Sequence, residues 1–227
     1  MKSIAIIPAR GGSKRIPKKN IKNFCGKPII AYSIAAAKES GLFDEVMVST
    51  DSEEIAEIAR AYGANVPFLR SEATSNDYAT TADVIAEVLD AYAADGKTFD
   101  YFACVYATAP FLTGEKLATA MHLLQKNRAA AVVSVVKYGF PPQRAFIIKD
   151  AYLQYQYPEF QQARSQDLEP IYHDAGQLYI CSCAAFKDRH SLIVPKTVPF
   201  IMVEEEVQDI DTMADWVIAE AKFQAMH

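Results

Sequence analysis

Apolar, strand-like runs alternate along this chain with segments of helical periodicity, and this alternation limits the possible folds more than any other feature. Strands are predicted at residues 3–9, 44–51, 101–110 and 130–138. Helices are predicted at residues 27–40, 52–63, 80–96 and 114–127. Strands that alternate with helices of this length form a mostly parallel sheet with helices on both faces. The predicted fold class is therefore α/β.

The chain has 227 residues, which is enough for one large domain, and we expect a single domain over 1–227. The alternation stops at 138–174, a stretch rich in proline and aromatic residues, before a further predicted strand at 177–186. A surface loop is one interpretation of this insertion. Because so many aromatic side chains rarely stay in water, a subunit interface or a substrate lid is at least as good an interpretation.

The overall charge limits the partners. The formal net charge is −5, and an acidic surface does not attract nucleic acid or anionic membranes. The apolar runs are too short to cross a hydrocarbon layer of roughly 30 Å, and the N-terminus lacks the pattern of a signal peptide. We expect a cytoplasmic protein that binds neither nucleic acid nor membrane.

The four cysteines lack the paired spacing of a zinc site or a redox motif. They are interpreted as buried free thiols in preference to metal ligands. Cys181 and Cys183 would share one face if the strand predicted at 177–186 is continuous.

Against the acidic background, segment 9–22 carries six lysines and arginines and no acidic residue. Gly11 and Gly12 would let backbone N–H groups approach an anion, and a polyphosphate with about three to four negative charges suits the surrounding cations. The spacing matches neither GxGxxG nor the P-loop. A solvated basic loop is the alternative, but the charges directly follow the first strand, and Pro17 and Pro28 restrict the backbone.

A second polar feature lies near the C-terminus. Asp209 and Asp211 are two apart in a segment that reads as extended, so both carboxylates should project to one side, with Ile210 opposite. Such a pair suits Mg²⁺, which also keeps waters and binds substrate phosphates. Alternatively, Asp211 or Thr212 caps the helix predicted at 212–226, which leaves Asp209 unexplained.

These features should meet in space. Segments 9–22, 49–51 and 107–110 all follow predicted strands, and ligands of parallel sheets bind beyond the carboxyl ends of the strands. Attack on an α-phosphate develops negative charge that lysine and Mg²⁺ stabilise. A basic polyphosphate loop and an acidic metal pair therefore complement each other.

Three motifs carry a resemblance to a known family. "IPARGGSKRIPKKN" at the first loop, "VSTD" at the second strand and "DIDT" near the end resemble the CMP-sialic acid synthetase family of cytidylyltransferases, in order and over nearly the whole chain. "YATAPF" and "HDAGQLY" stand where the neuraminate enzymes usually carry "QPTSP"-like and "RPNGA"-like segments. They are most similar to the branch that uses pseudaminic acid.

The resemblance implies a Rossmann-like, glycosyltransferase-A-like nucleotidyltransferase fold and a reaction. CTP and a nonulosonic acid, a nine-carbon acidic sugar, would give a CMP-sugar and pyrophosphate, when the anomeric hydroxyl attacks the α-phosphate. Pseudaminic acid is the preferred acceptor. Neuraminic acid, legionaminic acid or an eight-carbon keto acid is the alternative, and a noncatalytic nucleotide-binding protein is a more distant one.

The resemblance also implies roles for individual residues. Lys19, Asp209 and Asp211 would be catalytic, and the two aspartates would hold Mg²⁺. The implied substrate-binding residues are Arg10, Gly12, Ser13, Lys14, Asn20, Thr80, Thr81, Tyr106, Thr108, Pro110, Arg164, His173 and Gln177. For Thr80 and Thr81 a helix N-cap is an equal alternative, and for Tyr106 a buried strand tyrosine. The insertion at 138–174 resembles the family's dimerisation region, which implies a homodimer.

Overall fold

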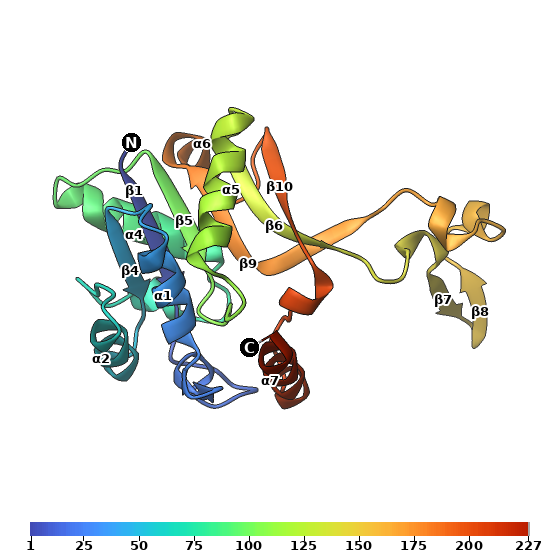
Figure 1. Ribbon diagram of the computed structural model, residues 1–227, viewed down its shortest axis with the longest axis horizontal. Coiled ribbons are helices and arrows are strands. Elements are labelled where there is room, and N and C mark those ends of the chain that lie inside the picture. Colours follow the sequence, from blue (N-terminus) through green and yellow to red (C-terminus); the bar gives the residue numbers. More distant parts are fainter. Residues whose placement is uncertain (227) are drawn as a thin grey trace.

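A six-stranded sheet in the order β10-β6-β9-β5-β1-β4 forms the centre of the computed structural model, which describes every residue except His227 (Figure 1). Its strands are β1 (Ser3–Pro8), β4 (Glu45–Ser49), β5 (Tyr101–Val105), β6 (Ala131–Lys137), β9 (Tyr172–Ser182) and β10 (Thr197–Met202). Only β9 runs antiparallel to its neighbours in this sheet. The predicted mostly parallel α/β fold is confirmed.

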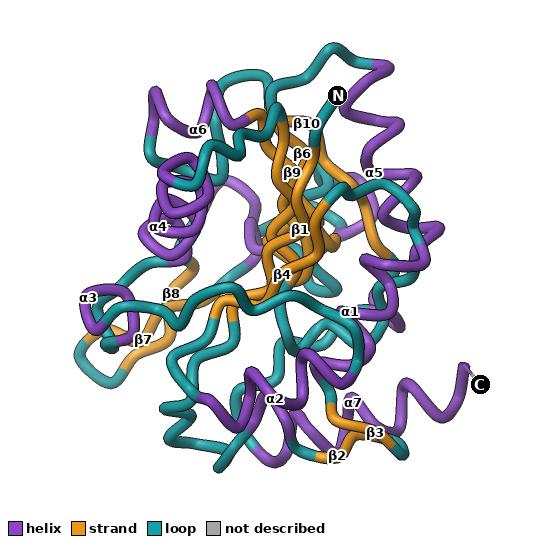
Figure 2. The backbone as a smooth tube through the Cα atoms, turned by 90° about the vertical axis from the view of Figure 1, so that its left-hand side faces the viewer, coloured by secondary structure: helices purple, strands orange, loops and turns teal. Residues whose placement is uncertain are grey.

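Helices cover both faces of the sheet (Figure 2). They are α1 (Ile30–Glu39), α2 (Glu53–Ala61), α3 (Glu72–Ser75), α4 (Thr81–Ala94), α5 (Gly114–Lys126), α6 (Cys183–Arg189) and α7 (Met213–Met226). Helices α1, α2 and α5 share a buried core with one face, and α4 and α6 with the other. Strand β1 shows why its sequence is apolar throughout: Ala5 and Ile7 face the first core, and Ile4 and Ile6 the second.

A third apolar cluster joins the basic loop to the C-terminal helix. Ile16 from the loop, Phe24 from the short β2 (Asn23–Phe24), and Ile210 and Trp216 from the C-terminal segment are all fully buried together. Each such side chain contributes roughly 1.5–3 kcal/mol on burial. This cluster fixes two segments about 190 residues apart in sequence against each other, as the numbering shows.

The predicted insertion forms an arm that extends away from the sheet between β6 and β9 (Figure 1). Its tip is a hairpin of β7 (Phe146–Lys149) and β8 (Tyr152–Tyr155). The hairpin and its base expose large apolar side chains, including Phe140 at 92% and Ile148 at 78%. The arm therefore presents an apolar surface.

Three predicted boundaries, on two strands, were wrong. The strand predicted at 177–186 begins earlier, at Tyr172, because β6 continues to Lys137 and pairs with it. It ends at Ser182, and Cys183 begins α6, so Cys181 and Cys183 do not lie on one strand face, although both are buried. The strand predicted at 101–110 ends at Val105, and the residues after it leave the sheet.

The remaining short element is β3 (Lys27–Pro28), which pairs with β2. Within residues 1–226, none of the helices is both long enough and apolar enough to span a bilayer.

Candidate functional site

A cavity of about 530 Å³ opens beyond the carboxyl ends of β1 and β5. It is lined by the basic loop, Arg70, the segment from Thr74 to Val84, the turn after β5, and Asp211. This is the expected place for a ligand of such a sheet. Ten of the predicted site residues line it: Arg10, Ser13, Lys14, Lys19, Asn20, Thr80, Thr81, Tyr106, Thr108 and Asp211.

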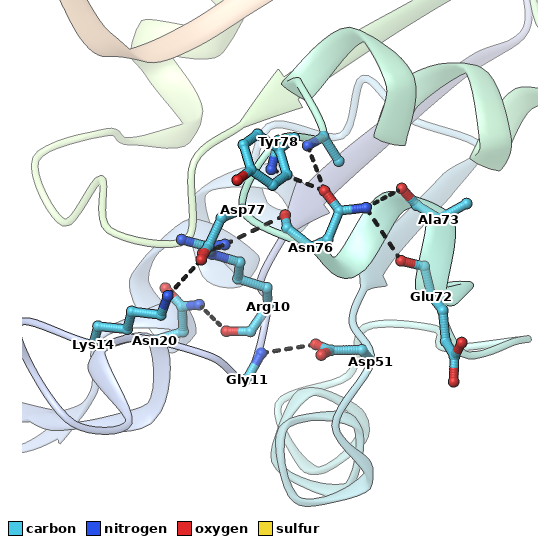
Figure 3. A network of polar contacts seen from close by, with 11 residues as sticks. Arg10, Gly11, Lys14, Asn20, Asp51, Glu72, Ala73, Asn76, Asp77 and Tyr78 are labelled. Atoms are coloured by element: carbon cyan, nitrogen blue, oxygen red, sulfur yellow. Dashed lines mark hydrogen bonds and ion pairs between the residues drawn. The ribbon is translucent and has the colours of Figure 1, made fainter.

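A hydrogen bond from Asn20 joins the two ends of the basic loop. The Asn20 side-chain amide donates to the carbonyl oxygen of Arg10 at 3.0 Å (Figure 3). At the other side of the loop, the N–H of Gly11 donates to Asp51 Oδ1 at 2.7 Å. A Cβ at Gly11 would lie 3.1 Å from the Cβ of Ser52, so glycine allows this close approach. At Gly12 a Cβ would meet no atom within 4 Å, so its predicted role near a ligand stays a prediction.

Asp77 forms ion pairs with two cations of the basic loop. Its carboxylate oxygens lie 2.7 Å from Arg10 Nη1 and 2.5 Å from Lys14 Nζ (Figure 3). These contacts, Lys14 first, lower the pKa of Asp77. The turn is held by Asn76, whose Oδ1 accepts hydrogen bonds from the N–H groups of Tyr78 and Ala79. An acidic side chain thus stands where an anionic ligand of Arg10 and Lys14 would bind.

The acidic pair lies against the basic loop. Asp211 Oδ1 is 2.9 Å from Arg15 Nη2 and 3.7 Å from Lys19 Nζ. Lys19 Nζ also donates to the carbonyl oxygen of Ile210 at 2.6 Å. Partial burial, and then the nearby Asp211 carboxylate, raise the pKa of Asp209. The predicted meeting of the loop with the acidic segment is therefore present.

The capping alternative is settled in favour of Thr212. Its Oγ1 accepts from the N–H of Asp215 at 3.3 Å, and Asp215 in turn accepts from the N–H of Thr212 at 2.7 Å. This reciprocal pair caps α7. Neither the Asp209 nor the Asp211 side chain is used as the cap, and Asp211 instead pairs with Arg15 and Lys19 of the basic loop.

The two threonines have different partners. Thr80 caps α4 in a capping box with Asp83, and it also lines the cavity. Thr81 Oγ1 lies 3.1 Å from the Tyr106 hydroxyl. Tyr106 follows β5, is partly buried, and lines the cavity. Burial raises its pKa. The N-cap interpretation of Thr80 is confirmed, and Tyr106 lies just after the strand and is not a fully buried strand residue. Substrate contacts of Thr80, Thr81 and Tyr106 stay predictions.

Five predicted residues lie outside the cavity besides Gly12. Pro110 is buried beside a different cavity, next to α1. Asp209 does not line the site cavity, but it is two residues before Asp211, which does. Gln177 is fully buried and donates to the carbonyl oxygen of Glu206 at 2.9 Å. Arg164 and His173 belong to other parts of the chain, described next.

The arm carries Arg164, which forms an ion pair with Asp167 at 2.7 Å. His173 lies at the base of the arm, where its ring packs on Tyr138 with 4.6 Å between centroids. A single copy of the chain does not bring either side chain to the cavity. Their roles near a sugar remain predictions.

Sequence reasoning missed Arg70. Its guanidinium, in a side chain only 8% exposed, donates to the carbonyl oxygen of Ser49 at 2.6 Å and to Ser49 Oγ at 3.0 Å, and it lines the cavity. Burial lowers its pKa. Its one sequence signal is a lone cation ending the apolar segment "NVPFLR". Asp77 was missed as well, because its partners are more than 60 residues away.

The cap of α4 predicts a change in acid stability. Hydrogen bonds from His190 first and then Thr80 lower the pKa of Asp83 to about 2. Since an aspartate ordinarily titrates near pH 4, this carboxylate stabilises the fold above about pH 4, and the stabilisation is lost as the pH falls towards 2. In urea unfolding, the stability difference between the native protein and Asp83→Asn should be largest at pH 5–7 and smaller at pH 3. An equal difference at both pH values would contradict this.

Comparison with known proteins agrees with this geometry. Residues 4–198 match the family model described as cytidylyltransferase. The chain is 40% identical to a pseudaminic acid cytidylyltransferase from Campylobacter jejuni, over 100% of this chain and 98% of that protein. It is 37% identical to a CMP-N,N'-diacetyllegionaminic acid synthase from Legionella pneumophila, over 97% and 95%.

One solved structure shows the same fold. A CMP:2-keto-3-deoxy-manno-octonic acid synthetase, complexed with CTP, aligns over 100% of both chains with a TM-score of 0.72 at 16% identity. The family model covers most of the chain, and the two relatives match it nearly end to end. This chain therefore belongs to the cytidylyltransferase family and is a nucleotidyltransferase.

Proposed function

We propose that this protein transfers the cytidylyl group of CTP to a nonulosonic acid, with pseudaminic acid as the preferred acceptor. The anomeric oxygen of the sugar forms a bond to the α-phosphorus, the bond between the α- and β-phosphates breaks, and the products are the CMP-sugar and pyrophosphate. One observation carries this proposal: the basic loop and Asp211 line a single cavity. The 40% identity to a pseudaminic acid cytidylyltransferase supports the choice of sugar.

The cations of the loop would bind the triphosphate. Arg10, Lys14 and Lys19 line the cavity, and each can make a charge-assisted hydrogen bond to a phosphate oxygen. Their fixed positions stabilise charge that grows on the leaving pyrophosphate. Arg15 faces the same cavity from the ion pair with Asp211. Catalysis of this kind needs positioning and charge more than covalent chemistry.

Asp209 and Asp211 would hold Mg²⁺. The donor set suits Mg²⁺ because both side chains are carboxylates, and a bound cation would relieve the repulsion by which Asp211 contributes to the raised pKa of Asp209. Residues 1–226 hold no group of three or more histidine, cysteine, aspartate or glutamate side chains placed for a metal, so oxygens of substrate and water would complete the shell. When bound, Mg²⁺ would supply positive charge to the triphosphate. Either carboxylate could accept the proton of the anomeric hydroxyl.

A substrate panel tests the proposed function. The protein would be mixed with CTP, Mg²⁺ and pseudaminic, legionaminic or N-acetylneuraminic acid, or an eight-carbon keto acid, and pyrophosphate release measured. We expect the highest kcat/KM with pseudaminic acid. The 37% identity to a legionaminic acid synthase makes legionaminic acid the second candidate. CTP binding with no pyrophosphate from any of these acids would indicate a noncatalytic nucleotide-binding protein.

Asp77 should compete with the triphosphate. Replacing it by asparagine removes the negative charge that pairs with Arg10 and Lys14, and exposed ion pairs of this kind contribute little. We expect Asp77→Asn to lower the KM for CTP about two- to fivefold. The control is Glu54→Gln, which breaks the exposed ion pair of Lys18 outside the cavity. A higher KM for CTP would mean that Asp77 orients the two cations.

The arm suggests a homodimer, which we also propose. Its exposed apolar side chains, Phe140, Ile148 and Tyr152 among them, would be covered by a second copy. Ile148→Ser combined with Tyr152→Ser should shift the protein to a monomer in analytical ultracentrifugation. Ile193→Ser, at an exposed apolar residue outside the arm, is the control. A dimer that survives the double change would place the interface elsewhere.

A further inference from the structure

Strand β9 contains an irregularity next to the cavity. Tyr179 pairs with Val133 of β6, but Val135, two residues further along β6, pairs with Asp174. Between these two pairs the chain of β9 advances by five residues and that of β6 by only two, so β9 bulges out of the ladder. Gly176, at the centre of the bulge, has a φ of +63°, which glycine adopts readily. The buried Ser134 hydroxyl accepts the N–H of Leu178 at 3.0 Å and replaces a ladder bond.

The bulge brings two side chains together that a regular strand would separate. Residues five apart on a strand point to opposite faces and lie about 17 Å apart. Here the Tyr179 hydroxyl donates to Asp174 Oδ2 at 2.5 Å, and the N–H of Gly176 donates to Asp174 Oδ1 at 2.8 Å. Bulges beside active sites commonly redirect a side chain in this way.

The contact continues into the cavity. The rings of Tyr179 and Tyr106 lie 5.6 Å apart between centroids, and the Tyr106 hydroxyl is 3.1 Å from Thr81 Oγ1. Burial first, and then the charges of Tyr106 and Asp174 and the hydrogen bond to Asp174, raise the pKa of Tyr179. A row of polar groups thus runs from Asp174 through Tyr179 and Tyr106 to Thr81. Only its Tyr106 and Thr81 end lines the cavity.

The carboxylate holds Tyr179 in place. A carboxylate accepts hydrogen bonds and donates none, so the one proton of the Tyr179 hydroxyl is committed to Asp174. The ring of Tyr179 packs against Tyr106 and limits the positions that the Tyr106 ring can take. The Tyr106 hydroxyl lies beside Thr81 in the wall of the cavity, where it can form a hydrogen bond with a ligand.

We infer that Asp174 is a positioning residue for the acceptor sugar: its hydrogen bond holds Tyr179, whose ring packs on Tyr106 and positions the Tyr106 hydroxyl for a hydrogen bond with that sugar. The inference rests on the proposed function. The sugar, in preference to CTP, is assigned to Tyr106 because Asp174 pairs with Val135 near the start of β9, where the chain returns from the arm, and does not line the cavity beside the basic loop.

Steady-state kinetics of two single variants and their combination test this role. Tyr179→Phe removes the hydrogen bond to Asp174 and keeps the contact of Asp174 with Gly176, and Asp174→Asn replaces the carboxylate that accepts from Tyr179 by a neutral amide. We expect each to raise the KM for the sugar about three- to tenfold, the loss of one net hydrogen bond, and to leave the KM for CTP within about twofold. Because both act through one row, the double variant should be no worse than the poorer single one.

Controls separate this role from general damage. Asp188→Asn makes the same change at an exposed aspartate of α6, and Tyr92→Phe makes it at a buried tyrosine of α4. Both should leave the KM for the sugar unchanged. If Asp174→Asn fails to fold, Tyr179→Phe carries the test alone.

Three results would overturn the inference. With an active native protein, a sugar KM within twofold in Tyr179→Phe means that the row does not position the sugar. A rise in the KM for CTP instead assigns the row to the nucleotide. If the native protein binds CTP in calorimetry but releases no pyrophosphate with any nine-carbon acid, the proposed function fails, and the role of Asp174 fails with it.

Discussion

Asp211→Asn should lower kcat at least about 10³-fold and leave the fold intact. The change keeps the size of the side chain and removes its charge, and charge stabilisation at such a site contributes several kcal/mol, or about one decade of rate per 1.4 kcal/mol. The carboxylate lies between Arg15 and Lys19 in the cavity, so its loss leaves two cations without their anion. The side chain is 41% exposed, and Thr212 caps α7, so folding does not depend on it.

Two measurements check this prediction. Pyrophosphate release at saturating CTP and sugar gives kcat, and thermal unfolding gives Tm, which should change by only a few degrees. Glu205→Gln, a nearby exposed acidic residue outside the cavity lining, is the matched control and should retain full activity. Unchanged kcat in Asp211→Asn would remove this carboxylate from the catalytic machinery and leave Asp209 without its partner.

The strands of the sheet show which part of the fold could be predicted from the sequence. The apolar run of β1 identifies a strand buried on both faces, and both faces are indeed covered. The direction of β9 has no such local signal. A buried antiparallel strand reads the same as a parallel one, because its hydrogen bonds to β5 and β6 are made by the backbone. The end of β9 was missed for a similar reason, since "CSCAAF" suits either a strand or a buried helix.

The site residues likewise fall into those that the sequence predicts and those that it does not. The rule that ligands bind beyond the strand ends predicted that loop 9–22 and the turn after β5 would lie together, and both line the cavity. Asp77 and Arg70 were not predicted, because their partners at the loop and at Ser49 come from tertiary packing. The row from Asp174 to Thr81 depends on a bulge, and the sequence shows only a glycine there.

Lys19→Ala should lower kcat/KM for CTP about 10²- to 10³-fold and also destabilise the protein. Lys19 makes two contacts, one with the carbonyl oxygen of Ile210 at 2.6 Å and one with Asp211 at 3.7 Å. Its side chain is 22% exposed and lines the cavity. Removing one hydrogen-bond donor from an oxyanion hole costs about 2.7–4 kcal/mol, and we expect a loss of this size for a cation that faces a growing phosphate charge. The Ile210 carbonyl also loses a charged donor, which costs about 1–3 kcal/mol of folding free energy.

The neighbouring lysine provides a matched control for this change. Lys18→Ala removes the same side chain from the same loop, but Lys18 is 66% exposed and pairs with Glu54, so kcat/KM should fall less than about threefold. Lys19→Arg keeps the charge and should recover part of the activity, although the guanidinium cannot reproduce the compact ammonium contact with Ile210. Urea unfolding separates the stability loss from the catalytic loss. A Lys19→Ala protein that raised only the KM for the sugar would assign this lysine to the acceptor, and the triphosphate would then depend on Arg10 and Lys14.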